Sequence, residues 1–176
     1  MALPDSLKVT PGTPIVCGQP GASGVTHALT LNGLADGSAR MSAVIDFGAS
    51  FDVEYSVLIV AEPTSAPTAG TRVDVYIPCT HSTSYYANEV TGSDGAIPSD
   101  GAEDEHALQW GAPAGSLIAT NDARVQVQAA VLWRPAGRYG VVIFDNNLGV
   151  ALKTDGTATD NKSRVIIVPL VAQVVD

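Results

Sequence analysis

A chain of 176 residues is long enough for one domain with a sizeable buried core. It carries 9 lysines and arginines against 18 aspartates and glutamates, a formal net charge of -9, and the basic residues are scattered along the sequence. A phosphate-binding face needs clustered basic residues and a membrane-spanning helix needs roughly 20 consecutive apolar residues, so we expect neither a nucleic-acid partner nor a membrane span.

The first 24 residues are rich in proline and predict an extended arm. Within it we expect at most a short edge strand over residues 13–17. Because proline reduces the conformational entropy that is lost on ordering, this arm suits wrapping around a neighbouring molecule, and Pro4, Pro11 and Pro14 are candidate contacts. The arm lacks the charged leader and apolar stretch of a signal peptide, so we expect the chain to fold in a cytoplasm.

Apolar and polar residues alternate in three segments, 52–60, 72–77 and 124–133. This period of two indicates strands with one buried face, whereas a helix would repeat its apolar residues at i, i+3 and i+4. Turn signals separate further apolar segments, which we predict as strands at 25–31, 41–47, 116–119, 138–144, 148–153 and 164–171. The sequence therefore predicts a single all-β domain over 25–176, an antiparallel β-sandwich or barrel.

Residues 81–105 form a long, polar, acidic loop without strand periodicity. A loop of this length is usually functional or becomes ordered on a partner. Its tyrosines and carboxylates are candidate partner contacts: Tyr85, Tyr86, Asp94, Asp100, Glu103 and Asp104. Calcium binding is a second interpretation, since calcium prefers several oxygen ligands, but the spacing does not match an EF-hand loop, and we expect no cofactor.

Known catalytic motifs are absent from the sequence. The histidines His27, His81 and His106 lie far apart, and there is no nucleophile elbow, Walker loop or Cys-x-x-Cys pair. We therefore expect no enzymatic activity. Cys17 and Cys79 are expected to be buried thiols, although the sequence leaves a disulfide between them open.

Short motifs over roughly residues 70–172 resemble a recurring layout in tailed-bacteriophage virion proteins. These motifs are Gly92-Ser93-Asp94-Gly95, Leu117-Ile118, Asn121-Asp122, Val125-Gln126-Val127-Gln128, Arg134-Pro135, Arg138-Tyr139-Gly140-Val141-Val142, Asp145-Asn146 and Ile166-Ile167-Val168-Pro169-Leu170. The resemblance implies a jelly-roll-like β-sandwich in a virion structural protein that decorates or cements a capsid.

The same resemblance implies a protein made in the host cytoplasm and located in the virion. Its partners would be the major capsid protein or other virion proteins, together with copies of itself, by analogy in a trimer. Two alternatives stay open. One is a tail, neck or baseplate sandwich that is an adaptor or binds host glycans, and the other is a carbohydrate-active enzyme that uses carboxylates of the 81–105 loop.

Overall fold

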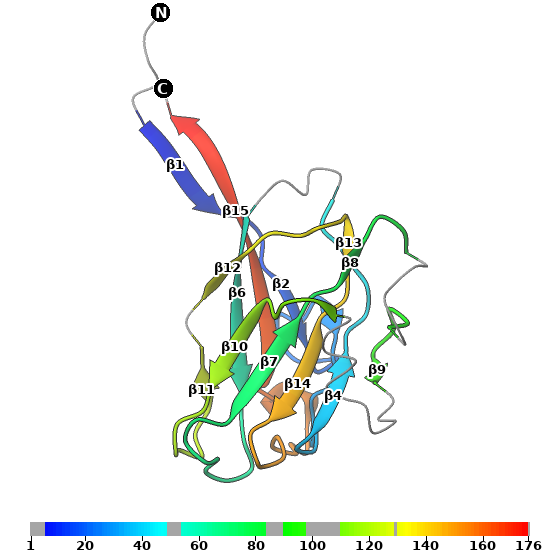
Figure 1. The fold of residues 1–176 in the computed structure, drawn as a ribbon, viewed down its shortest axis with the longest axis vertical. Helices are drawn as coiled ribbons and strands as arrows, with labels where there is room; N and C mark the ends of the chain where they lie inside the picture. Colours follow the sequence, from blue (N-terminus) through cyan, green and yellow to red (C-terminus); the bar gives the residue numbers. More distant parts are fainter. Residues whose placement is uncertain (1–5, 49–53, 84–89, 98–109, 129, 176) are drawn as a thin grey trace, which may run out of the picture.

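The computed structural model describes residues 6–48, 54–83, 90–97, 110–128 and 130–175. Two main sheets and one small sheet account for all their strands (Figure 1). The seven-stranded sheet has the order β11 (Gln126–Val127), β6 (Glu54–Ala61), β15 (Arg164–Val175), β2 (Ile15–Gly18), β3 (His27–Ala28). Two further strands extend it: β1 (Ser6–Pro11) pairs with β15, and β12 (Val131–Trp133) pairs with β6.

The second main sheet has five strands in the order β10 (Gly115–Ile118), β7 (Arg72–Tyr76), β14 (Ile143–Asn147), β4 (Ser38–Met41), β9 (Gly95–Ala96). The small sheet has the order β5 (Ile45–Asp46), β13 (Tyr139–Gly140), β8 (Cys79–Thr80), and a single 3-10 turn, η1, covers Ala158–Asp160. All pairings among these strands are antiparallel except β2 with β3. The structure confirms the predicted all-β, antiparallel sandwich.

The main core lies between the two large sheets, and the predicted alternation explains how it forms. On β6 the inward residues Tyr55, Val57 and Ile59 are buried, while Glu54, the first residue of the strand, is exposed. Inward residues of β15 join them and meet the second sheet's inward side chains Val73, Val75 and Phe144, all in one cluster. Burial of one face of each sheet is what holds the sandwich together.

The predicted strands 41–47, 124–133 and 138–144 are each interrupted, and the predicted strands 25–31 and 148–153 are shorter or absent. The predicted strand 148–153 has only the isolated bridge Pro63 to Leu152. The buried Asn146 side chain bends the chain there, because its Nδ2 donates to the carbonyl oxygens of Leu34, Ala35 and Val150. In the predicted strand 25–31 only His27–Ala28 pair, in parallel with β2.

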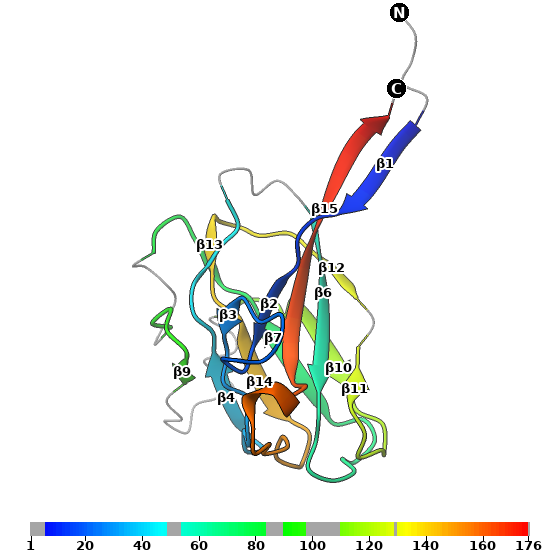
Figure 2. The same ribbon diagram turned by 180° about the vertical axis from the view of Figure 1, so that it is seen from behind.

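The predicted arm divides into two parts with different surroundings. Ile15–Gly18 lie inside the body of the seven-stranded sheet, between β15 and β3, so the predicted boundary at residue 24 falls within this sheet. Ser6–Pro11 pair with the far half of β15 and form a two-stranded ribbon that projects from the body (Figures 1 and 2). Both cysteines are free thiols, and burial raises the pKa of Cys17 to about 12.

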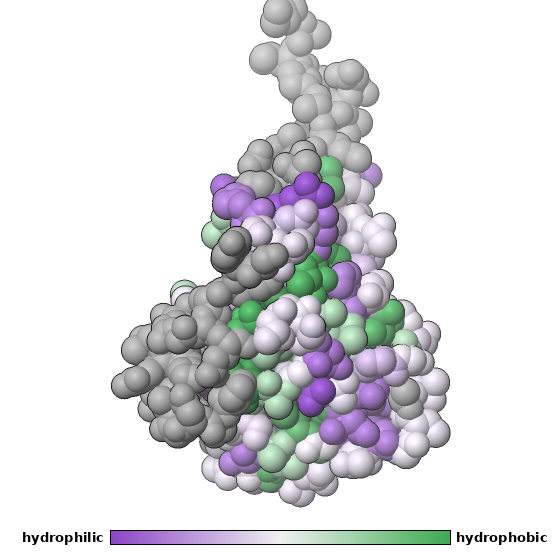
Figure 3. All heavy atoms as spheres, turned by 90° about the vertical axis from the view of Figure 1, so that its right-hand side faces the viewer, coloured by the Kyte–Doolittle hydropathy of each residue, from purple (hydrophilic) through white to green (hydrophobic). Residues whose placement is uncertain are grey.

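A second apolar cluster covers the outer face of the five-stranded sheet. It combines Met41 of β4, Tyr76 of β7 and Ile143 of β14 with Val90 and Ile97 from the described part of the acidic loop, and with Trp110 and Val141. The side of the molecule that carries β4 and β9 shows an apolar band bordered by polar side chains (Figure 3). The five-stranded sheet is therefore packed on both faces.

Candidate contact surfaces

The projecting ribbon is the first candidate surface. Its register runs from Ser6 opposite Val175 to Pro11 opposite Leu170, and at its base the Gly12 nitrogen donates to the Pro169 oxygen at 2.8 Å. The base needs glycine, because a Cβ on Gly12 would lie 2.7 Å from Cγ of Pro169. Along the ribbon Val9 is 56% exposed and Val171 39% exposed.

An exposed two-stranded ribbon of this kind is only marginally stable in water. Apolar side chains on it gain free energy when another surface covers them. The ribbon is thus suited to contact with a partner. Of the predicted contact prolines, Pro11 lies in β1, Pro14 follows it on the surface, and Pro4 lies outside the described residues.

The outer face of the seven-stranded sheet is the second candidate surface, and we name it the β6/β15 face. The strand registers place eight apolar side chains on it, namely Val16, Leu58, Val60, Val127, Leu132, Ile166, Val168 and Leu170. Val127 is 58% and Leu132 66% exposed. The solvated face of an antiparallel sheet is ordinarily polar, so the apolar β6/β15 face differs from an ordinary solvent-exposed sheet face.

The acidic loop contributes one described carboxylate, and this one is engaged within the chain. Asp94 Oδ1 accepts from the Thr30 nitrogen at 2.9 Å and from Arg40 Nε at 3.0 Å, and its Oδ2 accepts from the Thr30 hydroxyl. Burial raises the pKa of Asp94, but these hydrogen bonds outweigh it and the pKa is lowered overall. Asp94 therefore anchors the loop to β4.

The other predicted loop contacts, Tyr85, Tyr86, Asp100, Glu103 and Asp104, lie outside the described residues. Asp94 is thus the one predicted loop contact that the described residues include. The sequence suggested it as a partner contact, whereas in the structure it binds Thr30 and Arg40 of its own chain. Arg40 lies 54 residues earlier in the chain. This separation is why no local pattern could have paired the two residues.

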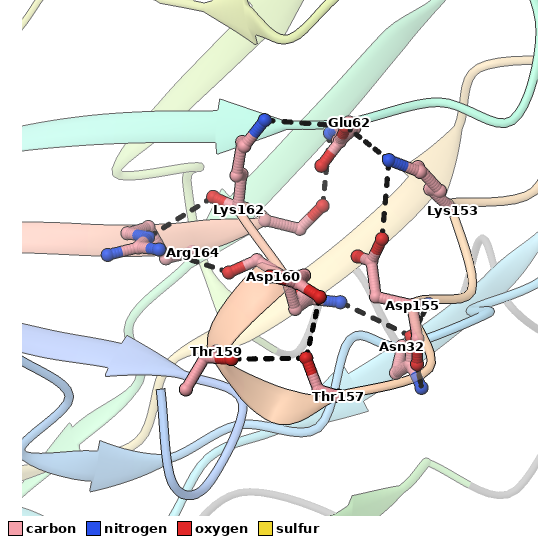
Figure 4. A network of polar contacts seen from close by, with 11 residues as sticks. Asn32, Glu62, Lys153, Asp155, Thr157, Thr159, Asp160, Lys162 and Arg164 are labelled. Atoms are coloured by element: carbon pink, nitrogen blue, oxygen red, sulfur yellow. Dashed lines mark hydrogen bonds and ion pairs between the residues drawn. The ribbon is translucent and has the colours of Figure 1, made fainter. Parts of the chain in front are cut away.

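A polar cluster links the end of β6 to the chain that enters β15 (Figure 4). Lys153 Nζ lies 2.9 Å from Glu62 Oε1 and 3.3 Å from Asp155 Oδ1, and Lys162 Nζ lies 4.0 Å from Glu62 Oε1. Both carboxylate side chains are more than nine-tenths buried. Two lysines balance two carboxylates, so the cluster offers no excess negative charge to a cation.

The remaining chemistry-bearing residues do not converge. Within the described ranges, no group of three or more histidine, cysteine, aspartate or glutamate residues is placed to hold a metal ion. His27 contacts Thr26, and burial lowers its pKa; His106 lies outside the description. No helix in the described part of the chain could cross a membrane.

Aromatic rings, which a glycan platform would need on the surface, pack inside the described structure. Trp110 is 7% exposed, and its ring centre lies 5.3 Å from that of Tyr76. Trp133 packs at 5.4 Å from Phe47 and 5.9 Å from Tyr55. These rings stabilise the two cores.

Sequence reasoning missed both contact surfaces as they stand in the structure. The ribbon depends on pairing between opposite ends of the chain, which no local pattern reports. The β6/β15 face did leave a signal, because Leu58 and Val60 interrupt the polar side of the alternation on β6.

Comparison of the chain with protein-family models, with curated proteins and with solved structures found no match.

Proposed function

We propose that this protein is a structural component of a tailed-phage particle that decorates or cements the capsid through protein–protein contacts. The observation that carries the proposal is the projecting ribbon of β1 and β15, with Val9 and Val171 exposed on it. A ribbon that extends beyond its own core reaches a neighbouring subunit without moving the sandwich. The motifs that resemble virion proteins give the neighbour its class, the major capsid protein or another virion protein.

The surface chemistry supports a role in contact. A charged fraction of 15% is low for a folded domain, and extended apolar surface in a charge-poor protein marks an interaction site. The protein would be made in the host cytoplasm and act in the virion, without a cofactor and without catalysis. Its free thiols fit a reducing compartment.

Binding to purified particles that lack this chain tests the proposal. We expect the double variant Val9→Asp/Val171→Asp to bind at least about tenfold more weakly, because a charge placed in an apolar contact costs more than about 1.4 kcal/mol. Ile118→Asp is the matched control, since Ile118 is 55% exposed and lies on β10, away from the ribbon. Unchanged binding of the ribbon variant would contradict the proposal.

The same ribbon would serve an adaptor in the neck, tail or baseplate. The position of the chain in a reconstructed particle separates this alternative from capsid decoration. Capsid binding that saturates at the joints between major subunits supports the first proposal. Density confined to the neck or tail supports the adaptor.

A further inference from the structure

The outer half of β15 has a strand partner on one side only. β6 accompanies β15 from Arg164 to Leu170, and β1 pairs with it on the opposite side, the side of β2, from Leu170 to Val175. Both ribbon views show β15 extending beyond the end of β6 (Figures 1 and 2). Among the described residues, no strand pairs with 171–175 on the β6 side.

The backbone of this stretch determines which hydrogen-bonding groups lie on its open side. The carbonyl oxygen of Pro169 accepts from the Gly12 nitrogen and therefore points to the β1 side. In an antiparallel strand the N–H and C=O of one residue point to the same side, and successive residues alternate. Every second residue beyond Pro169 thus pairs with β1, and the N–H and C=O groups of Ala172 and Val174 point to the open side.

The other strand edges of the described structure carry features that disfavour pairing with a second chain. β3, β5, β8, β9 and β11 have two residues each, β12 has three and β10 has four. The longer edge strand β1 carries Lys8 and Pro11. Short strands, lysine and proline all protect natural sheet edges. Residues 171–175 have the sequence VAQVV, with no charge and no proline, and so present an unprotected edge.

The same stretch of a second copy fits this edge in one register. An antiparallel pair centred on Gln173 places Ala172 of each copy opposite Val174 of the other. The open N–H and C=O groups of both residues are then paired, with two hydrogen bonds for each residue pair. A pair centred nearer the body would need the open side of Leu170, which Glu54 of β6 occupies.

The charge distribution permits this pairing. Each copy has a net charge of -9, so two bodies in direct contact would repel each other. In the register centred on Gln173, the two Leu170 residues lie about 20 Å apart at the rise of a strand. This separation exceeds the Debye length of about 10 Å at 0.1 M salt. The uncharged edges can therefore meet while the two acidic bodies stay screened from each other.

We infer that two copies of this chain pair edge to edge through residues 171–175 of β15, about a two-fold axis at Gln173. The two ribbons then form one four-stranded sheet in the order β1, β15, β15, β1, with a sandwich at each end. A self-complementary edge of this kind closes after two copies, and main-chain hydrogen bonds supply the recognition. The inference goes beyond the proposed function, because it concerns the free protein.

Sedimentation equilibrium of the full chain without particles tests the inference. We expect a dimer for the wild type, and an increase of at least about tenfold in the dimer dissociation constant for Val174→Pro, because proline removes an open-side N–H in each copy. Val9→Pro is the matched control. By the same alternation its N–H points away from β15, so both prolines spare the β1–β15 pairing. Val9→Pro should keep the wild-type dissociation constant.

The two-fold axis has its own test, because residue 173 lies opposite its own copy. Like charges at opposite positions weaken strand pairing and unlike charges strengthen it. We expect Gln173→Lys and Gln173→Glu each to dimerise more weakly than the wild type, and a mixture of the two variants to form the heterodimer. Random pairing in the mixture would contradict the axis.

Three results of the sedimentation experiment would overturn the inference: a wild-type monomer at about 1 mM, a trimer as the resemblance to virion proteins implies, or equal weakening by Val174→Pro and Val9→Pro. Failure of the inference and of the proposed function can be told apart. A monomeric Val174→Pro that binds purified particles supports the edge pairing and leaves the proposed function standing. Val9→Asp that stays dimeric but binds particles as the wild type does supports the edge pairing and counts against the proposed function.

Discussion

Arg138 and Asp46 form a bidentate ion pair that joins the start of β13 to β5 in the small sheet. Arg138 Nε donates to Asp46 Oδ1 at 2.9 Å and Nη2 donates to Oδ2 at 2.8 Å, while the guanidinium lies 5.0 Å from the ring centre of Tyr139. Hydrogen bonds from Arg138 and from the Gly48 nitrogen lower the pKa of Asp46 to about 2. The planar fork of arginine makes this geometry possible.

The pKa of Asp46 gives a prediction with a defined sign. A lowered folded-state pKa means that the pair stabilises the fold above the ordinary value of 3.8, and that this contribution is lost as the pH falls from 3.8 to about 2. Carbon NMR titration of the Asp46 carboxyl should give a midpoint near pH 2 in the wild type. In Arg138→Ala we expect the midpoint to move up toward 3.8, and an unchanged midpoint would show that arginine is not the cause.

Gly140 is a residue whose size is set by its neighbours. A Cβ at this position would lie 2.7 Å from Cε2 of Phe47, 3.2 Å from Sγ of Cys79 and 3.3 Å from Cγ2 of Ile77. We expect Gly140→Ala to lower the free energy of unfolding by about 1–3 kcal/mol through overpacking, measured by urea denaturation. Gly156→Ala is the matched control, because a Cβ there meets nothing within 4 Å; an equal loss in both variants would contradict the packing argument.

At the scale of elements, β2 decides how much of the N-terminal region belongs to the folded body. Cys17 on β2 is fully buried in the main core, and Ile15 packs against that core. The pairing of Val16 with Ile166 and of Cys17 with Val165 completes the hydrogen bonding of β15 on its second side. Of the ribbon residues whose side chains are described, 8–11 and 170–171, none belongs to either apolar cluster.

This difference predicts two outcomes for two truncations. Removal of residues 1–11 deletes β1 and should leave the melting temperature of the sandwich close to that of the wild type. Removal of residues 1–20 also deletes β2, and we expect a loss of about 3 kcal/mol or more in the free energy of unfolding, because burial of each large apolar side chain contributes about 1.5–3 kcal/mol. Thermal and urea unfolding followed by circular dichroism measure both, and equal stability of the two variants would refute the assignment of β2 to the core.

At the scale of the whole molecule, the sequence predicted the strands that carry an apolar pattern of their own, but not the pairings between distant strands. β6 and β7 lie where a period of two indicated strands, the third alternating segment, 124–133, forms β11 and β12, and β15 lies where an apolar segment next to turn signals predicted a strand. β1 and β9 have no such pattern, and their pairing partners β15 and β4 lie far away in the chain, so no local signal predicted them. Candidate contacts such as Asp94 were chosen because the loop is acidic. The ion pair of Asp94 with Arg40 forms only when the folded sheet brings the two residues together, so the sequence alone could not predict it.

The place of β15 between β6 and β2 has a consequence for synthesis on the ribosome. The chain makes β2 and β6 early, but the strand that joins them in one sheet is made after every other strand described here. Until β15 emerges, the apolar edges of β6 and β2 have no partner, and unpaired strand edges are prone to aggregate. We therefore expect the seven-stranded sheet to close only after β15 has been translated, when β6 and β2 gain the strand that joins them.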